Sequence, residues 1–175
     1  MGSLSFFFLL VLLHHSHFIT ANSDLIKKTC KNTNYYDLCL SSLKANASSS
    51  KADTRGLAVI MIGVGMANAN GTYTYLSSQL LSETNDTIMK KVLKECAYKY
   101  SNANDALKDS LVELDLMSFD YASVQLSAAK DYPNACHNAF KRFPGLAYPK
   151  ELASHEISLE RICDVASSIV NVLVW

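Results

Sequence analysis

The sequence predicts an all-α protein: an up-down-up-down four-helix bundle preceded by a short helical hairpin. Three observations lead to this prediction. Apolar residues recur at steps of three and four along four stretches that each exceed twenty residues. The connections between these stretches are short, so consecutive helices should run antiparallel. We find no stretch with the alternating apolar and polar pattern of a β-strand.

The longest predicted helix runs from Thr87 to Leu116, and the rest of the bundle is expected to pack around it. No Pro or Gly interrupts its roughly eight turns. Thr87 is the expected N-cap. The predicted apolar face consists of Ile88, Val92, Cys96, Tyr100, Ala103, Leu107, Leu111 and Leu114.

The first bundle helix is expected to run from its N-cap Asp53 to about Ser82. Three glycines lie within it, and we expect Gly63, Gly65 and Gly71 to permit close approach of neighbouring helices. A phosphate-binding loop is rejected at Gly63 because the context is a helix interior. The predicted inner face consists of Leu57, Ile60, Val64, Ala67, Gly71, Tyr75 and Ser78, with Leu81 near the end.

The last two bundle helices are expected at residues 120–142 and 150–173. Pro133 should kink or interrupt the former, because proline cannot donate the helical hydrogen bond. Its predicted inner stripe is Ala122, Leu126, Ala129, Cys136, Phe140 and Phe143. In the final helix the predicted seam is Leu152, His155, Leu159, Ile162, Ala166, Ile169 and Leu173.

The N-terminal part divides into a signal peptide, residues 1–23, and a domain over residues 24–175. The apolar run from Leu4 to Leu13 has the length of a signal-peptide core and is too short to span a bilayer. Cleavage is expected after Ala21 or Ser23. Within the domain we expect a helical hairpin over residues 24–44, a polar linker over residues 45–51 and the bundle over residues 52–175.

Secretion agrees with three sequons for N-glycosylation and with the number of cysteines. The sequons begin at Asn46, Asn70 and Asn85. The five cysteines include four that can pair in three ways. Local spacing favours Cys30 with Cys39, which leaves Cys96 for Cys136 and joins two bundle helices. Cys163 is then expected to be a buried free thiol.

The charge balance excludes several classes of partner. Sixteen Lys and Arg residues balance sixteen Asp and Glu residues, so the net charge is zero. Nucleic acids and anionic membrane surfaces both attract basic proteins, and we expect neither as a partner. We expect a monomer.

No arrangement of residues predicts catalysis or metal binding. Cys136 and His137 resemble a nucleophile pair, but a disulfide beside a surface histidine is the favoured interpretation. His155-Glu156 begins like a zinc-protease motif, yet Leu159 stands where the second histidine is needed. Carboxylates such as Asp109 lie at ordinary helical spacing. We therefore expect a protein that is not an enzyme and has neither cofactor nor metal.

The mature chain resembles the plant invertase/pectin methylesterase inhibitor family throughout its length. The resemblance lies in TCKNTNYYDLCLSSL, DTRGL, LKECAYKYSNANDAL, FDYASVQLSAA, ACHNAF and ISLERICDVASSIVNVL, in this order, and in four cysteines at matching intervals. It implies a four-helix bundle with an N-terminal hairpin, one disulfide within the hairpin and one between bundle helices. It also implies stoichiometric inhibition of a secreted plant carbohydrate enzyme.

The resemblance leaves two targets, pectin methylesterase and acid invertase. Cell-wall invertase inhibitors of this family carry Pro-Lys-Phe between the second and third bundle helices, and the lysine reaches acidic groups of the enzyme. Phe119, Asp120 and Tyr121 occupy the corresponding positions here. Because an aspartate would repel those acidic groups, and because Asp-Tyr is more typical of pectin methylesterase inhibitors, we favour pectin methylesterase.

In either case the bundle is expected to act as a rigid plug. Phe119, Asp120 and Tyr121 are the predicted target-binding residues, and the turn at Met117–Tyr121 should cover the substrate cleft. A rigid surface loses little conformational entropy on binding. The expected location is the apoplast or the vacuole. The alternative is a secreted helical binding or structural wall protein without inhibitory activity.

Overall fold

The longest helix of the computed structural model, α5, spans Thr87–Asp115 and lies within the described residues, 23–174. Its N-cap is Asp86, whose Oδ1 accepts a 2.7 Å hydrogen bond from the N–H of Met89, so the prediction of Thr87 as cap was wrong by one residue. Both residues are good caps, and the carboxylate reaches the N3 amide. Seven of the eight predicted face residues are buried or half-buried, whereas Ile88 is exposed because it lies in the first turn.

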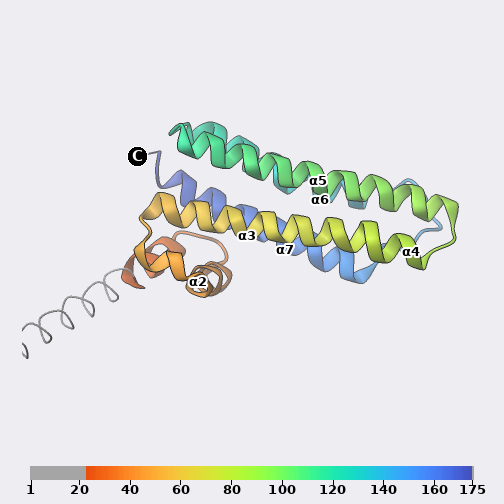
Figure 1. The fold of residues 1–175 in the computed structure, drawn as a ribbon, viewed down its shortest axis with the longest axis horizontal. Coiled ribbons are helices and arrows are strands. Elements are labelled where there is room, and N and C mark those ends of the chain that lie inside the picture. The colour runs from red at the N-terminus through yellow and green to blue at the C-terminus, as the bar shows by residue number, and fades with distance from the viewer. Residues whose placement is uncertain (1–22, 175) are drawn as a thin grey trace, which may run out of the picture.

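Three further helices complete the bundle predicted from the sequence (Figure 1). Helix α3, Thr54–Thr74, continues through a π-helical turn, η2 (Tyr75–Leu80), into the short α4 (Leu81–Glu83). Helix α6 spans Phe119–Lys141 and α7 spans Lys150–Asn171. Helix α5 packs between α3 and α6, and α7 packs between α6 and α3, so each long helix has two neighbours. The described residues contain no strand, and the up-down-up-down topology is confirmed.

The N-terminal hairpin is also confirmed. Residues 23–31 are helical, α2 spans Tyr36–Ala45, and the Cys30–Cys39 disulfide joins the two helices. Helix α2 packs against α3 and α7. The predicted signal peptide lies outside the described residues except for Ser23, the first helical residue. The stretch predicted as a linker forms a 3-10 helix, η1 (Ala47–Lys51), because the Asn46 side chain caps it by accepting from the N–H of Ser48.

The inner face of α3 differs from the prediction. Only Leu57 of the predicted residues is buried, and the observed face is Leu57, Ala58, Met61, Ile62, Gly65, Ala69 and Thr72, followed by Leu76 in η2. This helix is apolar around most of its circumference, so periodicity alone does not fix which side is buried. Of the three glycines only Gly65 has close neighbours: a Cβ there would lie 3.3 Å from Leu107 and 3.4 Å from Ile162.

The N-cap of α3 and the proline inside α6 were both anticipated from the sequence. Asp53 is the N-cap of α3, as predicted, and its Oδ1 accepts a 2.7 Å hydrogen bond from the N–H of Gly56. Pro133 is buried inside α6, which continues through it to Lys141, so the helix is not interrupted. The packing of α6 against α5 and α7 compensates for the hydrogen bond that the proline ring cannot make. No helix among the described residues has the length and apolar character needed to cross a membrane.

Candidate functional site

The connection between α5 and α6 is a helix C-cap with an unusual residue at its centre. The N–H of Ser118 donates to the carbonyl of Glu113 at 2.8 Å, and that of Met117 donates to the carbonyl of Leu114 at 3.2 Å. These two bonds define a Schellman motif, in which the residue at the position of Met117 is usually glycine. Met117 has φ 57° and is the one non-glycine residue with positive φ among residues 23–174. An L-residue in this conformation is strained by roughly 1–2 kcal/mol.

The strained turn presents large apolar side chains to solvent. Five of them are more than half exposed, and we call this group the turn patch: Val112 (56%), Leu116 (66%), Met117 (69%), Tyr121 (67%) and Val124 (62%). Scattered exposed apolar residues are ordinary, but five of them on one connection and on the helix turns beside it indicate an interaction surface. The strained backbone of Met117 is a second indication of a functional surface, because strained residues are frequent at binding sites.

The three residues that the sequence predicted as target-binding differ in their exposure to solvent. Phe119 is half-buried and packs against the core beneath the turn. Asp120 and Tyr121 are exposed in the first turn of α6. From the sequence, Met117 was expected only as the start of the turn. Val112, Leu116 and Val124 were not predicted, because their exposure depends on how the helices pack.

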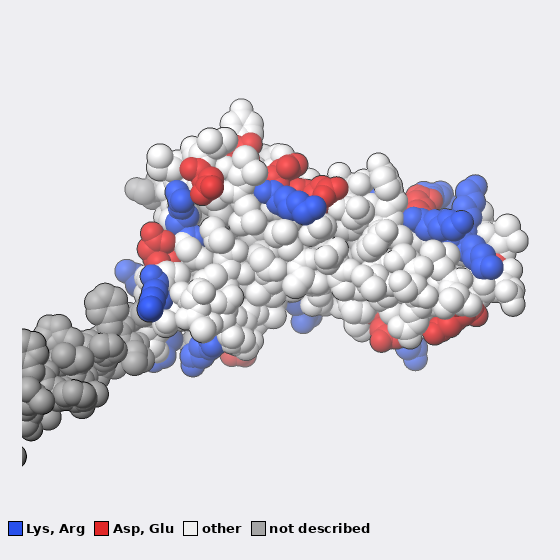
Figure 2. Space-filling model, viewed as in Figure 1, with Lys and Arg blue, Asp and Glu red and all other residues white. Residues whose placement is uncertain are grey.

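The turn patch has an acidic rim. Asp109, Glu113, Asp115 and Asp120 all lie in the last turns of α5 or the first turn of α6. Asp115 pairs with Arg55 of α3 at 3.2 Å while remaining 82% exposed, so solvent screens this pair. Figure 2 shows acidic side chains at the upper left, over this end of the bundle. Negative charge in the last turn of a helix opposes its macrodipole, so the stability of α5 does not explain Glu113 and Asp115, whereas Asp120 lies in the first turn of α6, where negative charge is favoured.

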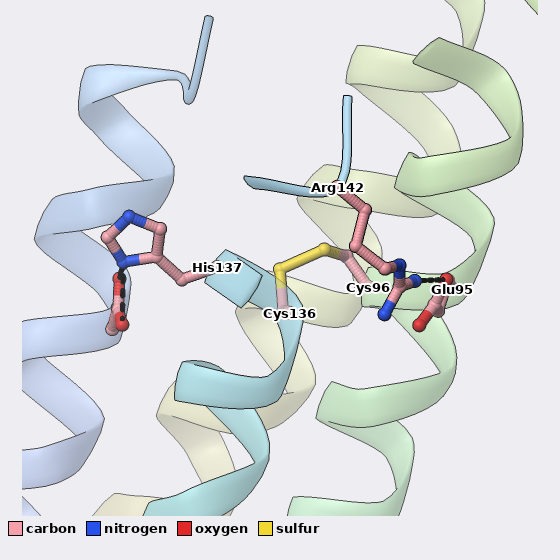
Figure 3. Close-up of a disulfide and its surroundings, with 6 residues drawn as sticks. Glu95, Cys96, Cys136, His137 and Arg142 are labelled. Carbon is pink, nitrogen blue, oxygen red and sulfur yellow. Dashed lines mark hydrogen bonds and ion pairs between the residues drawn. A yellow bond between two sulfur atoms is a disulfide. The ribbon is translucent and has the colours of Figure 1, made fainter. Parts of the chain in front are cut away.

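Helices α5 and α6 are held together at both ends. The turn joins them at one end, and the Cys96–Cys136 disulfide joins them toward the other, with a Cα–Cα distance of 4.6 Å. Twenty residues separate Cys96 from Leu116, which corresponds to about 30 Å of helix. Arg142 adds an ion pair with Glu95 close to the disulfide (Figure 3). The pair of helices that carries the turn patch is therefore fixed in its relative position.

His137 points from α6 to α7 and away from the disulfide (Figure 3). Its Nδ1 lies 3.2 Å from a carboxylate oxygen of Glu156, and its ring stacks on Tyr148 with centroids 4.3 Å apart. Glu156 is only 8% exposed. Because Cys136 is bonded to Cys96, the Cys136–His137 pair cannot act as a nucleophile, and the predicted disulfide is confirmed. The prediction of a surface histidine was wrong, because His137 is half-buried between Glu156 and Tyr148.

The remaining candidates for chemistry are explained by structure. Leu159 is buried in the core, so the incomplete zinc motif of α7 faces the bundle interior. Cys163 is a buried free thiol, as predicted, and burial raises its pKa to about 12, which keeps it protonated and unreactive. Within residues 23–174, no group of three or more His, Cys, Asp and Glu side chains is arranged to hold a metal ion.

The three predicted glycosylation sites lie at the surface. Asn46, Asn70 and Asn85 are all exposed, in the cap of η1, on α3 and in the connection before α5 respectively. None of them belongs to the turn patch, so glycans at these positions would leave it uncovered. Their occupancy stays a prediction.

Comparison with known proteins shows that this chain is similar to inhibitor proteins. Residues 24–169 match the family model described as plant invertase/pectin methylesterase inhibitor. An Arabidopsis thaliana protein named cell wall / vacuolar inhibitor of fructosidase 2 is 48% identical over 179 residues, which cover 99% of each chain. A rice protein named pectinesterase inhibitor 28 is 38% identical over 85% of this chain and 69% of its own.

A solved structure has the same fold. The crystal structure of a mutant form of an Arabidopsis pectin methylesterase inhibitor superposes with a TM-score of 0.67, covering 81% of this chain and 92% of the other. The two sequences are 22% identical. This similarity supports the helical bundle, and the choice of target depends on the sequence relatives and on the turn patch.

Proposed function

Because this chain belongs to the plant invertase/pectin methylesterase inhibitor family, we propose that it is a secreted inhibitor of a plant acid fructosidase. It is an inhibitor protein and not an enzyme, like the fructosidase inhibitor and the pectinesterase inhibitor to which it is similar. The observation that carries the choice of target is the 48% identity, over 99% of both chains, with a protein named as a fructosidase inhibitor. That protein's name also supports the cell wall or the vacuole as the location.

The turn patch supplies the physical basis of inhibition. Met117 and Tyr121 are each about two-thirds exposed, so a target cleft that covers them would bury a large apolar area. Tyrosine loses little side-chain entropy on binding and is frequent in the dominant contacts of protein interfaces. Since the disulfide and the turn hold α5 and α6 in place, binding costs little reorganisation. The inhibitor excludes substrate by occupying the cleft.

Pectin methylesterase is the second candidate, and the acidic rim favours it. A glycosidase cleft carries two catalytic carboxylates, which Asp120 would repel. An esterase that acts on an acidic polysaccharide needs a cleft that accepts carboxylates, and the rim around the turn patch complements such a cleft. The similarity to the rice pectinesterase inhibitor agrees with this alternative.

Substitutions at the turn test the proposal and distinguish the targets. Tyr121→Ala should raise the inhibition constant at least tenfold, which is about 1.4 kcal/mol. The matched control is Tyr98→Ala, because Tyr98 is 64% exposed on α5 but lies far from the turn. Asp120→Lys should strengthen inhibition of a fructosidase and weaken inhibition of a pectin methylesterase. Unchanged inhibition by the Tyr121 variant, with an unchanged melting temperature, would remove the turn from the interface.

A further inference from the structure

A groove runs between α3–η2 and the first half of α5, at the end of the bundle away from the turn patch. Helices α3 and α5 lie side by side on the face shown in Figure 1. The groove offers about 330 Å3 and is lined by Tyr73, Ser77, Leu81, Lys94, Tyr98 and Ser101, among others. Tyr73 and Tyr98 are 41% and 64% exposed, so two aromatic rings and two hydroxyl groups are available in one groove.

A stripe of lysines enters the groove from the start of α5. Lys90, Lys91 and Lys94 lie in the first two turns, and Lys94 lines the groove directly. Among residues 23–174 none of the three forms an ion pair. Figure 2 shows basic side chains gathered at the upper right, over this end of the bundle. Positive charge at a helix N-terminus is disfavoured by the macrodipole, so helix stability does not account for the stripe.

The wall of the groove opposite the lysines contains the π-helical turn η2, Tyr75–Leu80. π-Helical turns are rare and are frequent at functional sites. The hydroxyl of Tyr75 donates a 3.0 Å hydrogen bond to the Glu151 carboxylate, which connects the π-helical turn to α7. Burial and the neighbouring carboxylate raise the pKa of Tyr75 to about 12, so this donor is retained over the physiological range. Ser77 of the same turn lines the groove.

We propose that this groove binds an acidic polysaccharide made of uronic acid units. The lysines match the carboxylates of such a chain, the two tyrosine rings can pack against the C–H faces of its sugar rings, and Ser77 and Ser101 can bond its hydroxyl groups. The site goes beyond inhibition of an enzyme, because it would hold the protein on the wall polymer itself. Because the net charge of the chain is zero and the second half of α5 is acidic, binding of the polyanion is confined to this lysine-bearing end of the bundle.

The experiment measures binding of the mature, oxidised protein to polygalacturonate by affinity electrophoresis. Fully methyl-esterified pectin has the same backbone without the charge, and dextran sulfate is a polyanion without uronate. Lys90, Lys91 and Lys94 are changed together to Gln. The matched control changes Lys28, Lys31 and Lys44 to Gln, which removes the same charge from exposed positions of the hairpin.

We expect the Lys90/Lys91/Lys94 variant to bind polygalacturonate at least tenfold more weakly, with the control variant unchanged. Tyr98→Ala should weaken binding to polygalacturonate and leave binding to dextran sulfate unchanged. Equal loss in both lysine variants, no binding by the native protein, or full retention by Tyr98→Ala would each overturn the proposal. Melting temperatures of all variants establish that the fold is intact.

The same variants separate this proposal from the proposed inhibition. The Lys90/Lys91/Lys94 variant should inhibit its target enzyme like the native protein, because none of these residues belongs to the turn patch. Tyr121→Ala should show the reverse, with weaker inhibition and unchanged binding to polygalacturonate. Failure of one proposal therefore leaves the other standing.

Discussion

Substitution of Met117 tests whether the strained turn serves binding at the expense of stability. Met117→Gly removes a side chain that is strained at φ 57°. Relief of roughly 1–2 kcal/mol of strain is offset by roughly 0.5–1 kcal/mol, because glycine gains freedom in the unfolded chain. The midpoints of the two ranges leave a net gain of about 0.75 kcal/mol, within limits of roughly 0 and 1.5 kcal/mol, which raises the melting temperature by about 1.5–3 °C for a domain of this size.

The same variant should inhibit less well. Met117 is 69% exposed in the free protein, and loss of an apolar contact of this kind costs about 1–2 kcal/mol. The inhibition constant should therefore rise about five- to thirtyfold. The two measurements are a thermal melt followed by circular dichroism and an inhibition titration against the target enzyme.

Met117→Ala is the matched control, because it shortens the side chain but keeps the Cβ that causes the strain. It should lose inhibition like the glycine variant without gaining stability. Equal melting temperatures for the alanine and glycine variants would refute the strain argument. Native inhibition by both variants would show that Met117 lies outside the interface.

Three further predictions concern stability. Replacement of both Cys96 and Cys136 by Ala removes the disulfide that closes a loop of 40 residues. This should lower the free energy of unfolding by about 4 kcal/mol and the melting temperature by about 8–16 °C. A decrease in melting temperature of less than about 3 °C would contradict this prediction. Gly63→Ala should stabilise α3 by about 1 kcal/mol, because nothing lies within 4 Å of the added Cβ, and a lower melting temperature would show a hidden clash. Burial raises the pKa of the Glu160 carboxyl above its ordinary value of 4.5, so the folded protein loses stability relative to the unfolded chain as the pH rises above that value. Glu160→Gln should therefore melt at a higher temperature than the native protein at pH 7 but not at pH 4. An equal difference in melting temperature at both pH values would count against this prediction.

The sequence predicted α5, α6 and α7 well because each has one apolar stripe. Periodicity therefore placed Leu107, Leu126 and Leu159 in the core. The inner face of α3 was predicted wrongly because small and apolar residues surround this helix. Its orientation is decided by Gly65, which fits against side chains of two other helices, and such a contact is invisible in sequence.

The candidate site was only partly predictable. The turn and its exposed residues Asp120 and Tyr121 followed from chain order and from the family resemblance. The left-handed conformation of Met117 could not be predicted, because the Schellman motif usually has glycine there. The burial of Glu156 beside His137 was also missed, since a charged residue is rarely buried without a partner and the partner lies on another helix.

The most direct test of the central claim is a titration of the mature, oxidised protein against a plant acid fructosidase, with a plant pectin methylesterase in parallel. We predict that fructosidase activity falls linearly to zero at a one-to-one ratio at mildly acidic pH. Loss of esterase activity alone would show that the acidic rim, and not the similarity to a fructosidase inhibitor, determines the target. Full activity of both enzymes at a large excess of the protein would contradict the account of the turn patch as an inhibitory surface.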